Sequence, residues 1–101
     1  MSKEPSDRLE VESVDAYVVY DPGSGAIVHV HRAFNYRGTK RLPSGEAGEA
    51  RALEMAARFG HRTEGLRALT VSPDELEVIG RRRVDDKTRR LVVDRDRDST
   101  D

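Results

Sequence analysis

The sequence predicts a small α+β domain in which two β-hairpins and one additional strand form a small sheet and one main helix packs on one face. Two observations support this prediction. The pattern from Tyr20 to Val28 recurs from Val84 to Val92: an apolar residue, Asp, two turn residues, Ser or Thr, two more positions, and then an aliphatic pair, which is typical of a hairpin. Between the two copies, alanine and leucine recur at helical spacing. The expected order is two strands, the main helix, a strand, a short second helix and two strands.

The composition fits one domain with a thin core and excludes several kinds of protein. The 101 residues are 36% hydrophobic and 37% charged, and the formal net charge of −1 favours no class of partner. The absence of cysteine excludes disulfides and thiolate metal sites. No apolar run approaches the roughly 20 residues needed to cross a bilayer, so we expect no membrane segment. The polar, acidic start does not resemble a signal segment, and we expect a cytoplasmic protein.

We expect a single domain over residues 13–94, between two flexible tails. Residues 1–12 and 95–101 are polar and charged, and neither stretch shows the periodicity of a helix or a strand. Acidic residues predominate in both tails, whereas basic residues predominate at 31–41 and 81–90. Any basic surface therefore belongs to the body of the domain.

The first hairpin is predicted from strands at about 13–20 and 26–34. Asp21 can accept hydrogen bonds from turn amides, Pro22 presets φ at the first corner, and Gly25 can take the positive φ that ends such a loop with a bulge. Alternation places apolar residues on both faces of these strands. The better candidate for the core is the face with Val14, Ala16, Val18, Tyr20, Ala26, Val28, Val30 and Phe34.

A long basic loop at 35–45 leads into the main helix, which is predicted at about 45–59. Ser44 is a suitable N-cap, and Gly60 stands where a helix commonly ends with a positive φ. The apolar stripe expected to face the sheet consists of Ala47, Ala50, Leu53 and Ala57, widened by Met55 and Ala56.

The remaining elements are a strand at 66–71, a short helix and the second hairpin. Ser72, Pro73 and Glu75 have the spacing of a capping box with proline in the first turn, and Val71 and Leu76 have that of a hydrophobic staple. The second hairpin is predicted from strands at about 81–85 and 89–94.

No pattern in the sequence carries a reaction, so we expect a non-enzymatic binding or assembly module. The serines lie in tails, turns or helix starts, where local hydrogen bonding explains them. A lone sheet covered by one helix leaves a second face or an edge to bury against a protein partner or another copy, which makes a homo-oligomer possible. The residues expected to bind the partner are Tyr17, Val19, Ile27, His29 and His31.

Nucleic-acid binding is the alternative function. Basic residues in loop 32–41 alternate with aromatic ones, and basic residues recur in the hairpin at 81–90. Phosphates attract basic side chains, and unpaired bases stack on aromatic ones. The residues expected to make these contacts are Arg32, Tyr36, Arg37, Lys40, Arg41, Arg81 and Arg83.

Metal binding is a weaker hypothesis, based on His29 and His31. Alternate residues of a strand project to one side, so both imidazoles can reach one ion. Zinc needs three or four ligands, and the third would have to come from His61, Glu64 or Asp15. The simpler interpretation is a half-solvated strand face, so we expect no metal and no cofactor.

Overall fold

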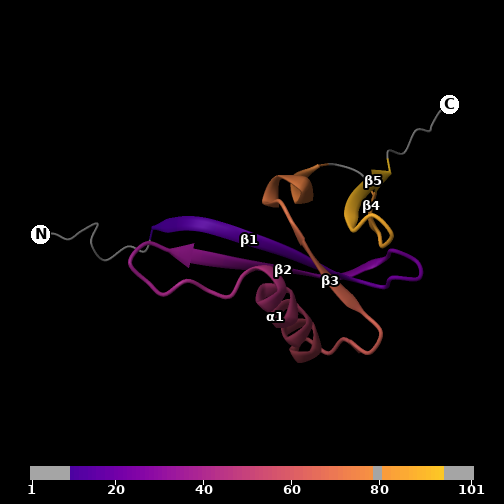
Figure 1. Ribbon diagram of the computed structural model, residues 1–101, viewed down its shortest axis with the longest axis horizontal. Coiled ribbons are helices and arrows are strands. Elements are labelled where there is room, and N and C mark those ends of the chain that lie inside the picture. Colours follow the sequence, from indigo (N-terminus) through magenta and orange to yellow (C-terminus); the bar gives the residue numbers. More distant parts are fainter. Residues whose placement is uncertain (1–9, 79–80, 95–101) are drawn as a thin grey trace, which may run out of the picture.

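The computed structural model describes residues 10–78 and 81–94 and confirms the α+β class and the predicted element order (Figure 1). Strands β1 (Val11–Tyr20) and β2 (Ile27–Tyr36) form a long hairpin and lead into helix α1 (Gly45–Arg58). Strand β3 (Arg67–Val71), the 3₁₀ helix η2 (Pro73–Glu77) and the hairpin of β4 (Arg81–Asp85) and β5 (Arg90–Asp94) follow. The expected tails at 1–12 and 95–101 lie outside the described residues, except that 10–12 lead into and begin β1.

The strands form two sheets rather than the single sheet that the sequence predicts. The first is antiparallel with order β2-β1-β3, and the second is the β4–β5 hairpin alone. Among the described residues, the strand pairing that joins the two sheets is a bridge between Ala26 and Arg83, beside a backbone hydrogen bond of 2.9 Å from the Val84 N–H to the Gly25 carbonyl. The second hairpin therefore arches over the turn end of the first.

Both predicted hairpin turns are present and share their geometry. The carboxylates of Asp21 and Asp85 each accept a hydrogen bond from the backbone N–H two residues later, at 2.8 and 3.1 Å. Gly25 has φ +80°, and Arg89, its counterpart in the second copy, has φ +57°. The repeated sequence pattern thus encodes a repeated turn, with arginine in the second copy at a position that favours glycine.

The main helix ends as predicted but presents a different face to the sheet. The backbone N–H groups of Gly60 and His61 return to the carbonyls of Ala57 and Ala56, the pattern of a Schellman motif, with Gly60 at φ +93°. Ser44 is the N-cap residue, although its side chain makes no capping bond. The buried helical residues are Gly48, Ala52 and Ala56, so the predicted stripe was wrong except for Ala56: Ala47, Ala50 and Ala57 are exposed, and Leu53 is half-buried.

The short second helix forms as predicted. Ser72 accepts a hydrogen bond from the Asp74 N–H, and the Glu75 carboxylate accepts one from the Ser72 N–H at 2.8 Å, which completes the capping box. Val71 and Leu76 are both buried in the same cluster. Local sequence therefore determines this helix start.

The first sheet is covered on both faces, and each face has its own core. Helix α1 covers one face, where Tyr17, Val19, Ala33 and Ala68 pack against the helical alanines. On the other face, η2 and the second hairpin cover a cluster comprising Ala16, Val18, Tyr20, Leu69, Val71, Leu76 and Val84. Figure 1 shows α1 on one side of the long hairpin, with η2 and β4–β5 on the other.

The predicted core face of the first hairpin was only half correct. Its β1 residues Ala16, Val18 and Tyr20 are fully buried, whereas Val28 and Val30 of β2 stay exposed. The reason is that η2 and the second hairpin lie over β1 and β3, which leaves the outer strand β2 uncovered on this face.

Candidate interaction surface

The five residues predicted to bind a partner do not form one surface. Tyr17 and Val19 are 1% and 0% exposed beneath α1, so the expectation that they lie on an open face is wrong. Ile27 packs against the opposite core, because the β1–β2 register shifts between Val19 and Tyr20. His29 and His31 remain half-buried on β2.

The histidines cluster with aromatic rings on the helix side of β2. The His29 ring lies 5.6 Å, centroid to centroid, from both Phe59 and His61, and the His31 ring stacks on Tyr17 at 5.9 Å. Burial lowers the pKa of His29, with further lowering by the charges of His61 and His31. Both effects favour neutral imidazole. Over the described ranges, no three histidine or carboxylate side chains are grouped as metal ligands.

The apolar surface that remains open belongs to β2, on the face opposite α1. Val28, Val30 and Phe34 are 38%, 37% and 42% exposed, and alternation along the strand places them on one side. We call these three side chains and Arg32, which stands exposed between them, the β2 strip. Contiguous exposed apolar surface can mark a binding site, which makes this strip a candidate.

The same strand also presents an open backbone edge. One edge of β2 pairs with β1, and along the other edge the described residues provide only the bridge of Ala26, which precedes the strand, to Arg83. An unpaired edge offers a row of N–H and C=O groups to another strand. Proline, lysine and acidic residues, which commonly block such an edge, are absent from Ile27–Tyr36.

A small hollow lies beside this edge, between β2 and the helix. It measures about 100 Å³ and is lined by residues of β1, β2, the loop after β2 and α1, among them Tyr17, His31, Phe34, Leu42 and Arg51. A hollow next to a strand edge can receive a side chain of an added strand, which is how such edges gain specificity.

The residues predicted to bind nucleic acid are divided between the two ends of β2. Arg37, Lys40 and Arg41 are exposed in the loop that follows the strand, and Arg37 makes a 3.6 Å ion pair with Glu10. Arg81 and Arg83 lie on β4, which meets the chain at Ala26, just before the strand begins. A ten-residue strand spans about 30 Å. Only Arg32 lies between the two groups, and Tyr36 is half-buried, so the basic residues form no continuous patch.

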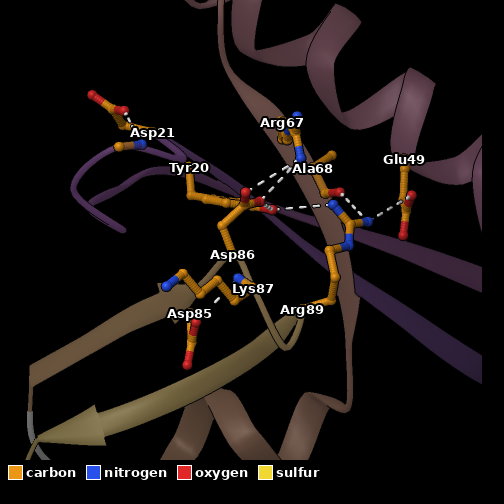
Figure 2. A network of polar contacts seen from close by, with 10 residues as sticks. Tyr20, Asp21, Glu49, Arg67, Ala68, Asp85, Asp86, Lys87 and Arg89 are labelled. Carbon is orange, nitrogen blue, oxygen red and sulfur yellow. Dashed lines mark hydrogen bonds and ion pairs between the residues drawn. The ribbon is translucent and has the colours of Figure 1, made fainter.

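Sequence analysis missed the polar network that attaches the second hairpin to the sheet (Figure 2). Arg89 donates hydrogen bonds to the Tyr20 hydroxyl at 3.1 Å and to the Ala68 carbonyl at 3.3 Å, and its guanidinium lies 3.7 Å from Glu49 of α1. The Tyr20 hydroxyl donates to Asp86 at 2.6 Å. One side chain of the second hairpin thus contacts the first sheet and the helix.

The same network fixes the protonation state of its tyrosine. Burial raises the pKa of Tyr20, and the hydrogen bond to Asp86 raises it further, so the phenol keeps its proton and remains a donor. Arg67 contacts the same carboxylate at 3.2 Å. The available signal was the arginine at the turn position where the first copy has Gly25; a side chain held at positive φ needs contacts that compensate for it.

Comparisons with known proteins identify no relative. No family model matches the chain, and neither the curated proteins nor the solved structures contain a match. Among the described residues, no helix is long and apolar enough to cross a membrane.

Proposed function

We propose that this protein is a non-enzymatic binding or assembly module that adds a strand of a protein partner, or of another copy, to the open edge of β2. The observation that carries the proposal is the coincidence of an unpaired edge with the β2 strip on a single strand. Strand addition uses both: the backbone supplies affinity, and alternate side chains supply specificity.

The rest of the fold supports this proposal by making the strand rigid. β2 is held along its whole length by β1, in a register that runs from Ile27 to Tyr36, and α1 packs beneath it. A strand already fixed in extended form loses little entropy when a partner binds.

Nucleic-acid binding remains the second proposal, and the arrangement of charge supports it less well. The loop cations and the β4 cations are about a strand length apart. Phe34 is the single aromatic side chain of the strip, and valines do not provide the flat rings on which bases stack. If Lys40 and Arg41 contact phosphates, affinity for a single-stranded probe should fall with a log–log salt slope of about −0.7 per contact.

The proposal is tested by two variants that place one new carboxylate on different surfaces. Val30→Asp puts the charge on the β2 strip, and Ala50→Asp puts it on the exposed outer face of α1. Both positions are open, so circular dichroism melting should show that both variants stay folded. Solution mass over a range of concentrations and affinity capture from the host lysate are then compared among the three proteins.

We expect Val30→Asp to lose self-association or a captured protein that both the parent and Ala50→Asp retain. Equal behaviour of the two variants, or selective loss in Ala50→Asp, would place the interaction elsewhere and contradict the proposal.

A further inference from the structure

We infer that the strand added to β2 is an extended acidic segment of a protein partner, with apolar residues facing the β2 strip and carboxylates facing its cations. The inference rests on the proposed function and names the chemistry of its partner. Three features of the open edge lead to it: its charge, its side-chain shape and its backbone.

The charge along the edge is uniformly positive or neutral. Ile27–Tyr36 contains no acidic residue, and its central exposed cation, Arg32, has no carboxylate within ion-pair distance among the described residues. Arg81 is exposed two residues along β4 from the bridge at Ala26, and Lys40 and Arg41 are exposed beyond the other end. A carboxylate at the centre of an added strand would face Arg32, and carboxylates at its ends would lie toward the cations near the ends of β2.

The same charge pattern argues against a second copy as the occupant. Two β2 strands paired edge to edge would bring two arginine-bearing strands together, with no acidic residue on either strand to separate the charges. Like charges on neighbouring strands destabilise a sheet. Pairing with a second copy would therefore form the backbone hydrogen bonds of the edge but would bring like charges together.

Shape and backbone argue for a peptide rather than a nucleic acid. Val28 and Val30 offer branched aliphatic surface, which matches apolar side chains of a neighbouring strand. The small hollow of about 100 Å³ beside His31 and Phe34 can receive a side chain of the added strand. The unpaired N–H and C=O groups find their natural partners in another polypeptide backbone.

The test uses a peptide that reads the same in both directions, so that it assumes no strand orientation: Glu-Thr-Val-Thr-Glu-Thr-Val-Thr-Glu. When its central glutamate lies opposite Arg32, its valines lie opposite Val30 and Phe34. A second peptide replaces the three glutamates with lysine. A third places proline at the two threonines beside the central glutamate, which removes backbone donors. Binding is measured as backbone N–H shift changes in the full chain.

We expect the glutamate peptide to bind and to shift resonances of residues 28–36, with the lysine and proline peptides at least tenfold weaker. Arg32→Glu should weaken the glutamate peptide about three- to tenfold and strengthen the lysine peptide, since an exposed pair is worth up to about 1 kcal/mol and reversal adds repulsion. Arg90→Glu, which makes the same charge change at an exposed position of β5, should alter neither affinity.

The possible results distinguish an acidic partner from strand addition in general. Equal binding of the glutamate and lysine peptides, with loss only for the proline peptide, would leave strand addition intact and overturn the acidic partner. A dimer in solution that competes with every peptide would make a second copy the occupant. Shifts of 28–36 with a single-stranded oligonucleotide, and with no peptide, would overturn both in favour of nucleic acid. No shift with any probe, from a monomeric protein, would also overturn both.

Discussion

Replacing Gly48 with alanine should destabilise the domain, although the same change in an ordinary helix would stabilise it. Gly48 lies within α1, is buried, and faces the sheet above Tyr17. A methyl group built there would fall on the Tyr17 hydroxyl oxygen and lie 2.5 Å from the ring carbon Cζ. Glycine is thus required here for close approach of the helix.

Two opposing terms decide the magnitude. Alanine gains about 1 kcal/mol of helix propensity over glycine. Against this, Tyr17 is 1% exposed, its hydroxyl donates to the Pro43 carbonyl at 3.3 Å, and its ring stacks on His31. Because these contacts hold the ring in place, α1 must lift, and an overpacked core of this kind costs about 1–3 kcal/mol. Lifting also opens a gap above Ala52, and such a gap forfeits a quarter to a half of each dispersion contact.

We therefore expect a net loss of about 1–2 kcal/mol in the free energy of unfolding, measured by urea denaturation, and a fall in Tm of roughly 5–15 °C. Ala50→Gly, at an exposed position of the same helix, is the control: it should cost about 1 kcal/mol through propensity alone. Both directions of the alanine–glycine exchange should thus destabilise. A stability gain for Gly48→Ala of the size lost in Ala50→Gly would refute the reasoning and show that Tyr17 yields.

Three further predictions concern the turns and the histidines. Gly25→Ala should lower the free energy of unfolding by at least about 2 kcal/mol, and Gly38→Ala by about 1 kcal/mol. Both glycines have positive φ, but an added methyl group at Gly25 would also lie 2.5 Å from the Val84 carbonyl oxygen. Similar losses for the two variants in urea denaturation would rule out the close contact. Arg89→Ala should destabilise more than Arg89→Gly by about 1 kcal/mol, because glycine relieves the positive φ that alanine keeps; equal stabilities would show an unstrained turn. Folding lowers the pKa of His29, so the unfolded chain binds more protons and stability should fall as pH drops below about 6.5. Between pH 7.5 and 5, Tm should decline less in His29→Gln than in the parent protein. Identical profiles of Tm against pH would exclude this residue as the cause.

Features determined by a few neighbouring residues were predictable from the sequence. The two turns were found because each has an aspartate two residues before the amide that it binds, and the first also has Gly25 where φ is positive. The capping box at Ser72 and the helix end at Gly60 follow the same logic. The class and the order of the elements follow from these signals.

The candidate surface was not predictable in the same way, because its position depends on which faces become covered. Strand β1 carries apolar residues on both faces, and α1 carries alanine on several sides. Alternation along a strand and helical periodicity then show which residues share a face, but they do not show which face becomes buried. Two wrong choices followed: Tyr17 and Val19 were taken for surface, and Val28 and Val30 for core.

By itself, the sequence determined two hairpins, a helix between them and a capped short helix, since each depends on local backbone chemistry. The tertiary structure decided that small residues at Gly48, Ala52 and Ala56 seat the helix on Tyr17, because only they permit so close an approach. It also decided that the second hairpin, held by Arg89, lies over β1 and β3. With both faces of β1 covered, the apolar side chains of the outer strand β2 stay exposed beside its unpaired edge.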